Sequence, residues 1–189
     1  IVGYVGQRDC TDVLMQGLEK LEYRGYDSAG IAVFEKTGIK TVKTKGKLAD
    51  MRHKLDIEGS PVGHCGIGHT RWATHGEPST VNAHPQYTRE KRVVLVHNGI
   101  IENYVEIKEF LIGQGIRFKS ETDTEVVAQL LEFYYNECHD FLEAVGRVLR
   151  RIEGAYALGM LCADCPDRII AARGRILRDI FPVGLGGDH

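Results

Sequence analysis

The sequence has no apolar run that approaches the ~20 residues of a membrane-spanning helix. It also lacks the charged and then apolar start of a secretory signal peptide. Five cysteines in 189 residues are an odd number, without the density of a disulfide-stabilised secreted domain. These absences favour a cytoplasmic protein that has no membrane partner.

Positive charge is scattered along the chain. Lysine and arginine number 24 against 26 acidic residues, the formal net charge is -2, and the only basic cluster is a loose one at residues 36–47. Nucleic-acid phosphates require a dense positive field. The composition therefore argues against a nucleic-acid partner.

The composition fits a globular protein with a full core. At 43% hydrophobic residues, the chain forms one domain, or two small ones. It contains no internal repeat, low-complexity segment or linker. We interpret residues 1–189 as a single domain.

Metal-binding patterns are weak. Cys162 and Cys165 have redox or zinc spacing, but no second pair completes a metal site. We interpret this spacing as chance, with Cys65 and Cys162 as core thiols. Four histidines also lack the close pairing of ligands: His69, His75, His84 and His97. We expect no metal and no cofactor.

Hydrophobic periodicity predicts groups of strands that alternate with groups of helices. Strands are predicted at residues 1–6, 30–34, 39–44, 63–70, 92–97, 154–162 and 168–172. Helices are predicted from Asp9 to about residue 21, at 48–55, 102–111, about 122–135 and 140–152. Residues 22–30 read as a turn, and 174–189 give no clear element. The pattern indicates an α+β fold with helices outside two layers of sheet.

Functional groups are concentrated at residues 69–78, directly after a predicted buried strand. This run supplies a guanidinium, the only tryptophan, two hydroxyls and two imidazoles. Scaffolds commonly place binding residues at such positions. By composition alone, a polar turn with one aromatic anchor is an equally good interpretation.

Asn98 and Gly99 follow the clearest predicted strand. On local rules this dipeptide is a hairpin turn. Only two apolar residues follow before helical spacing begins, which is too short for a return strand. The side-chain amide of Asn98 and the backbone amide of Gly99 are therefore left for another use.

Four motifs, in order, carry a family resemblance. They are Tyr-Arg-Gly-Tyr-Asp-Ser-Ala-Gly at 23–30, His-Thr-Arg-Trp-Ala-Thr-His-Gly at 69–76, His-Asn-Gly at 97–99 and Ser-Glu-Thr-Asp-Thr-Glu at 120–125. Together they resemble the class II glutamine amidotransferases, across roughly residues 1–173. The first two motifs are similar to the glucosamine-6-phosphate synthase branch, whereas amidophosphoribosyltransferases differ at both places.

The resemblance implies a four-layer αββα N-terminal-nucleophile hydrolase fold and a glutaminase activity that releases ammonia. In this family a terminal cysteine is the nucleophile and its α-amine is the base. The family has Cys-Gly before the position of Ile1, so the polypeptide as written lacks this nucleophile and is not expected to hydrolyse glutamine. A rigidly held terminus would explain the strand at residue 1.

The resemblance also assigns roles to individual residues. Asn98 and Gly99 match the catalytic oxyanion donors. Arg71 matches the clamp on the α-carboxylate of glutamine and Asp123 the partner of its α-ammonium group. The residues that would bind or enclose glutamine are Arg71, Trp72, Thr74, His75, Gly76 and Asp123, with Arg24 in support. Taken singly, Arg71 could be an ion-pair partner, Asp123 a helix-start residue and Trp72 a core anchor.

The implied partners are glutamine and an ammonia-accepting sugar-phosphate isomerase domain of the same polypeptide. The family continues with more strands and with synthase domains, so this chain resembles an isolated amidotransferase domain, shortened at its C-terminus. A homo-oligomer is expected at full length. Another acceptor, as in amidophosphoribosyltransferases, and a non-catalytic glutamine-binding module stay open as alternatives.

Overall fold

The computed structural model describes residues 1–72, 76–174 and 178–184, except the side chains of Arg24 and of 178–184. The helices are α1 (Cys10–Glu19), α2 (Leu48–Glu58), α3 (Tyr104–Gly113), α4 (Asp123–Cys138) and α5 (Phe141–Arg151), with a short 3-10 helix η1 (Glu22–Arg24). None of the helices in these ranges has both the length and the apolar character needed to cross a membrane.

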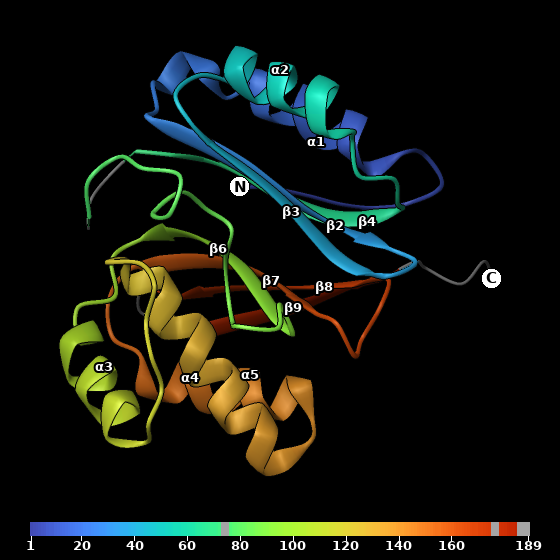
Figure 1. The fold of residues 1–189 in the computed structure, drawn as a ribbon. Helices are drawn as coiled ribbons and strands as arrows, with labels where there is room; N and C mark the ends of the chain where they lie inside the picture. Colours follow the sequence, from blue (N-terminus) through green and yellow to red (C-terminus); the bar gives the residue numbers. More distant parts are fainter. Residues whose placement is uncertain (73–75, 175–177, 185–189) are drawn as a thin grey trace.

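The strands form two antiparallel sheets. One sheet has the order β1 (Val2–Val5), β4 (Cys65–Arg71), β2 (Ser28–Glu35) and β3 (Gly38–Lys45). The other has the order β5 (Gln86–Tyr87), β6 (Val93–Gly99), β7 (Tyr156–Cys162), β8 (Arg168–Gly174) and β9 (Arg178–Gly184). Helices α1 and α2 cover the outer face of the first sheet, and α3, α4 and α5 that of the second (Figure 1). The predicted four-layer αββα fold is confirmed.

The side chains of β2 alternate between the two faces of the first sheet, and both faces are buried. Ile31 and Val33 face α1 and α2, where they join a cluster with Leu14, Leu18 and Met51. Ala32 and Phe34 face the second sheet and pack with Val94, Val96 and Leu161. Successive side chains of a strand point to opposite faces, so a strand buried on both faces is apolar throughout.

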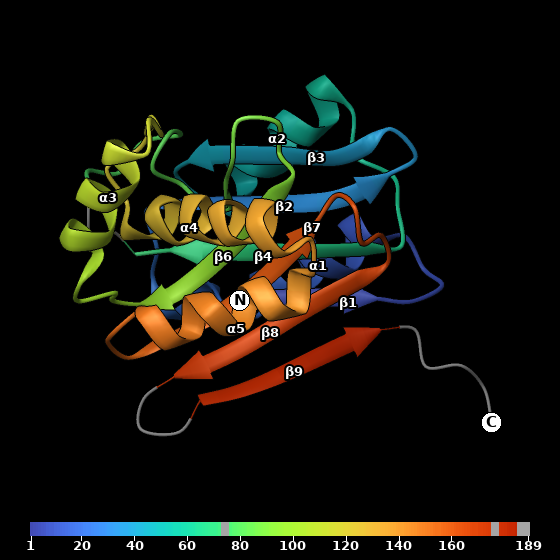
Figure 2. The same ribbon diagram turned by 90° about the horizontal axis from the view of Figure 1, so that it is seen from below.

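A third cluster fixes the helices on the second sheet. Leu130 of α4 and Leu149 of α5 pack there with Leu95 of β6 and Leu158 of β7. The two helices lie over the strands β6, β7 and β8 when the molecule is seen from below (Figure 2). This packing brings the first turn of α4 to the end of β6.

The N-terminal segment is held in the sheet, as the sequence predicts. Val2 pairs with Gly68 of β4, and Ile1 packs against the cluster between the sheets. Backbone pairing and burial together fix the position of residue 1. Residue 1 thus lies at the core between the two sheets.

Three details differ from the sequence prediction. β2 begins at Ser28, inside the predicted turn, because its first residues pair with Arg71 of β4 and Lys45 of β3. Strand β9 lies in the segment without a clear prediction. Thr122 caps α4 by accepting a hydrogen bond from the backbone of Glu125, but the Glu125 carboxylate bonds to the backbone of Lys119 and Ser120 instead of completing a capping box.

Candidate active site

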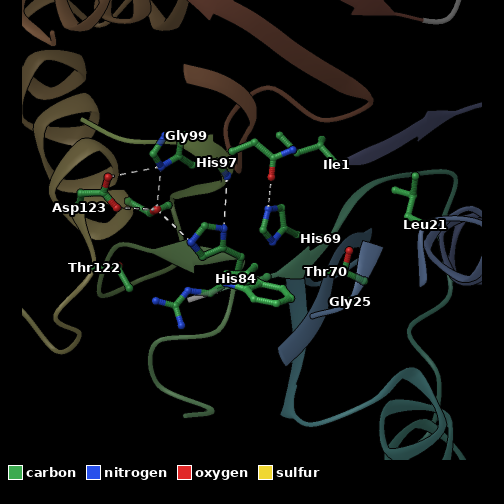
Figure 3. A pocket seen from close by; sticks show the side chains of 14 residues that line it. Ile1, Leu21, Gly25, His69, Thr70, His84, His97, Gly99, Thr122 and Asp123 are labelled. Atoms are coloured by element: carbon green, nitrogen blue, oxygen red, sulfur yellow. Dashed lines mark hydrogen bonds and ion pairs between the residues drawn. The ribbon is translucent and has the colours of Figure 1, made fainter. Parts of the chain in front are cut away.

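A cavity of about 390 Å³ lies where β4, β6 and α4 meet. Its lining combines residues from the end of β4, the end of β6, the first turn of α4 and the chain start (Figure 3). The lining residues are Ile1, Leu21, Gly25, His69, Thr70, Arg71, Trp72, His84, His97, Asn98, Gly99, Thr122, Asp123 and Thr124. All four motifs of the sequence therefore contribute to one cavity.

Arg71 is the buried cation of this cavity. The residue is only 4% exposed, and its Nη2 donates a hydrogen bond to the carbonyl of Gly76 at 3.2 Å. Nη1 lies 3.9 Å from the Asp27 carboxylate. Burial lowers the pKa of the guanidinium, and the charges of Asp27 and Asp123 oppose this change. The side chain is thus held rigidly, so little conformational entropy would be lost on binding an anion.

Asp123 is the buried anion, at 3% exposure in the first turn of α4. The backbone N–H of Ile101 donates to its Oδ2 at 3.0 Å. The same oxygen lies 3.8 Å from Nδ1 of His97. A carboxylate held by a backbone donor at a helix N-terminus keeps a fixed direction. The cavity therefore presents one cation and one anion on separate elements.

His69 orients the side-chain amide of Asn98. Its Nε2 lies 2.6 Å from Asn98 Oδ1. Burial lowers the pKa of His69 to about 3, so the ring is neutral. Because Oδ1 only accepts, Nε2 carries the proton and donates it. Asn98 then offers its Nδ2 donor group to a ligand.

Gly99 occupies a backbone conformation that only glycine fits here. Its φ is 118°, and an added Cβ would lie 2.1 Å from the carbonyl oxygen of Ala155. The residue pairs with Tyr156 of β7, and the chain then turns towards α3 without forming a hairpin. The predicted absence of a hairpin is confirmed.

A second buried network lies under the cavity. The backbone N–H of His97 donates to Nδ1 of His84 at 3.4 Å, and Nε2 of His84 lies 3.0 Å from Thr124 Oγ1. His97 Nδ1 lies 3.1 Å from the same hydroxyl. Burial lowers the pKa of His84 well below its ordinary value. Because Nδ1 of His84 accepts, its Nε2 carries the proton and donates it to Thr124.

The structure brings together most of the predicted site residues. Arg71, Trp72, Asn98, Gly99 and Asp123 line the cavity. Trp72 is 70% exposed and its ring lies against Gly25, where an added Cβ would be 2.9 Å away, so it is no core anchor. Gly76 contacts Arg71 through its carbonyl.

Some predicted residues cannot be placed. Thr74, His75 and the side chain of Arg24 lie outside the described residues. Conversely, the sequence interpretation gave no role to His84, Thr124 or Ile1, which the cavity includes. His97 and Thr124 stand within the recognised motifs, but His84 has no local signal in the sequence.

Within the described ranges, no three His, Cys, Asp or Glu side chains are grouped so that they could hold a metal ion. The histidines of the cavity bond instead to an amide, a backbone N–H and a hydroxyl. These contacts use the ring nitrogens as hydrogen-bonding groups.

Comparison with known families gives one match over more than half of the chain. Residues 69–178 match the family described as glutamine amidotransferase domain. The matched segment contains the end of β4, all of β6 and all of α4, which carry Arg71, Asn98, Gly99 and Asp123.

Two similar curated proteins share one name. Glutamine–fructose-6-phosphate aminotransferase (isomerizing) of Clostridium perfringens is 54% identical over 173 residues, which are 92% of this chain and 28% of the relative. The protein of the same name from Thermus thermophilus is 54% identical over 176 residues, with the same coverage. This chain thus spans less than a third of the length of these relatives.

Solved structures include similar folds. Glutamine phosphoribosylpyrophosphate amidotransferase from B. subtilis has a TM-score of 0.77 and 25% identity, over 90% of this chain and 36% of that one. A structure described as the allosteric regulatory enzyme of purine biosynthesis has a TM-score of 0.78 and 26% identity. Each likeness covers 90% of this chain.

Proposed function

The chain belongs to the glutamine amidotransferase domain family, and we propose that it hydrolyses glutamine to glutamate and ammonia. One observation carries this proposal. Arg71, Asp123, Asn98 and Gly99, which come from three separate motifs, line a single cavity. Amide hydrolysis through a thiol requires a substrate clamp, oxyanion donors and a nucleophile. Arg71 and Asp123 provide the clamp, Asn98 and Gly99 provide the donors, and a cysteine before Ile1 provides the nucleophile.

The charged pair accounts for the choice of substrate. The guanidinium of Arg71 binds the α-carboxylate of glutamine, because its fork of donors matches a planar anion. The Asp123 carboxylate binds the α-ammonium group. Both side chains are buried, so their charges act at low dielectric and exclude ligands that carry only one of the two groups.

Asn98 and Gly99 provide the oxyanion donors. When a thiolate adds to the carboxamide carbon of glutamine, the carbonyl oxygen becomes negative. Nδ2 of Asn98, fixed through the contact of Oδ1 with His69, and the N–H of Gly99 donate to that oxygen. One such donor contributes about 3 kcal/mol to the stability of the transition state.

The nucleophile is a cysteine that precedes Ile1 in the mature protein, in line with the family resemblance. Ile1 lines the same cavity, and two further residues span only about 7 Å. The α-amine takes the thiol proton and passes it to the departing ammonia. Water then cleaves the thioester and releases glutamate, which restores the thiol.

The acceptor of the ammonia is fructose 6-phosphate, and this chain is the glutaminase domain of a longer protein. Relatives named for that acceptor are 54% identical, whereas the phosphoribosylpyrophosphate amidotransferase is 25% identical. The remaining length of these relatives leaves room for the sugar-phosphate isomerase domain. A cytoplasmic location and a homo-oligomer stay predictions.

The first experiment determines the intact mass and N-terminal residue of the mature protein and then assays glutamate release. Protein that begins with the cysteine should release glutamate, and a variant with serine in its place should bind glutamine without turnover. Glutamate release by a chain that begins at Ile1 would disprove the mechanism. Binding without turnover by the cysteine form would instead support a non-catalytic glutamine-binding module.

A second assay distinguishes the acceptors. With the full-length protein, fructose 6-phosphate and glutamine should together give an amino sugar phosphate, with glutamate formed in equal amount. Phosphoribosyl pyrophosphate should give no pyrophosphate. The opposite result would favour the acceptor of the phosphoribosyl-transferring relatives.

A further inference from the structure

The turn between β7 and β8 brings two thiols together far from the glutamine cavity. Cys162 ends β7 and is buried, and Cys165 is half-buried in the turn. The backbone N–H of Cys165 donates to the carbonyl of Cys162 at 3.0 Å. Such a turn keeps the first and fourth Cα atoms within about 7 Å, close to the range that a disulfide requires.

The side chains of the two cysteines belong to the same apolar region, because Cys162 is part of the cluster on the second sheet and Cys165 packs against that cluster. Burial raises the pKa of Cys162 to about 12. Two thiols on the first and fourth residues of a tight turn need only a small movement to form an S–S bond. Cys10 and Cys65, by contrast, are both buried and lie in α1 and β4.

Asp164, between the two cysteines, is clamped in place. Its Oδ2 lies 2.7 Å from Nε of Arg92 and 3.1 Å from the hydroxyl of Tyr135. The guanidinium of Arg92 also lies 4.5 Å from the centre of the Tyr135 ring. These contacts hold the turn in the shape that keeps the thiols adjacent, so little conformational entropy remains to be lost on closing a bond.

A cavity gives access to this pair. It has a volume of about 380 Å³ and is lined by Cys162, Cys165, His139, Asp140 and Arg168, among others. Arg168 and Asp140 provide one positive and one negative group at its rim. A small disulfide that carries charged groups could therefore approach the sulfur of Cys165, which is the more exposed of the two thiols.

We propose that Cys162 and Cys165 are a reversible dithiol–disulfide site that exchanges with small-molecule disulfides. The Cys165 thiolate attacks one sulfur of the reagent, forms a mixed disulfide and releases one thiol. The Cys162 thiolate then attacks the Cys165 sulfur and releases the second thiol. Two protein thiols are oxidised to one disulfide, the reagent disulfide is reduced to two thiols, and the two protons pass to the released thiolates.

The test treats the purified protein with mixtures of glutathione disulfide and glutathione, blocks free thiols by alkylation, and maps the cysteines by mass spectrometry. The wild-type protein should lose two hydrogen atoms, with the bond located between Cys162 and Cys165. Excess glutathione should restore both thiols. A protein that stays reduced, or a bond that joins other cysteines, would overturn the proposal.

Three variants make the result specific. Cys165→Ser should abolish the intramolecular bond, whereas the matched control Cys138→Ser, another half-buried cysteine, should leave it intact. Cys162→Ala should accumulate a glutathione adduct on Cys165, because the resolving thiol is gone. If the adduct on Cys165 persists in the wild-type protein without closing, Cys162 is not the resolving thiol and the proposal fails.

Discussion

Nε2 of His69 donates a hydrogen bond to Oδ1 of Asn98, with 2.6 Å between the two atoms. The two residues end adjacent strands of different sheets, β4 and β6. This contact fixes which end of the Asn98 amide can face a substrate. The orientation of a proposed oxyanion donor thus depends on packing between the two layers.

Replacement of His69 by phenylalanine should reduce the kcat for glutamine by about 10- to 100-fold, because the amide of Asn98 loses its fixed orientation. The KM should change little, since Arg71 and Asp123 remain. Steady-state glutaminase assays on the protein with its terminal cysteine would measure both constants.

The variant His69→Gln tests why His69→Phe should lose activity. His69→Gln keeps a donor group and should recover part of the activity, whereas His53→Phe, at an exposed position of α2, should behave as wild type. Equal losses in His69→Phe and His69→Gln would show that the hydrogen bond to Asn98 is not the cause.

Arg71→Lys should raise the KM for glutamine by about 10- to 100-fold, because an ammonium group cannot replace the two parallel hydrogen bonds of a guanidinium to a carboxylate. The kcat should fall less. Arg147→Lys is the matched control, since Arg147 forms a surface pair with Glu143. An unchanged KM for Arg71→Lys would remove Arg71 from the glutamine clamp.

Gly99→Ala should destabilise the protein by more than about 1–3 kcal/mol, the usual cost of a strained backbone conformation alone. The added Cβ would also meet the carbonyl of Ala155 at 2.1 Å. Urea unfolding would measure the change. Gly113→Ala is the control, because no atom lies within 4 Å of its added Cβ at the end of α3. Equal stability of the two variants would contradict this conformational argument.

The sequence predicts the layers and most of the site for identifiable reasons. Strand β6 is a continuous apolar run, and Asn98 and Gly99 follow it with too few residues for a hairpin return. The strand ends and helix starts that carry Arg71 and Asp123 are likewise local patterns. Their meeting in one cavity follows from the family resemblance, and the structure places them there.

Other features depend on contacts between distant segments. His84 reaches Thr124 across 40 residues, and nothing local distinguishes it from an ordinary loop histidine. β2 starts early because Ser28 pairs with Arg71, which is set by the sheet and not by turn propensity. The Glu125 carboxylate bonds to Lys119 and Ser120 instead of closing the capping box, because the preceding loop folds back over the helix start.

The buried histidines predict how stability depends on pH. Burial lowers the pKa of His69 to about 3 and that of His84 well below its ordinary value near 6.5. The unfolded chain therefore binds more protons than the folded protein below about pH 6.5, so stability rises with pH in that range. The free energy of unfolding should fall as the pH drops from 6.5, with a slope that approaches about 1.4 kcal/mol per pH unit for each histidine. Urea unfolding between about pH 7.5 and 5, where most carboxylates stay ionised, would measure this slope.

His84→Gln should reduce the slope, because it removes one of the two buried histidines, whereas His53→Gln should not. A stability that is constant or rises on acidification would show that these imidazoles are not held neutral by burial.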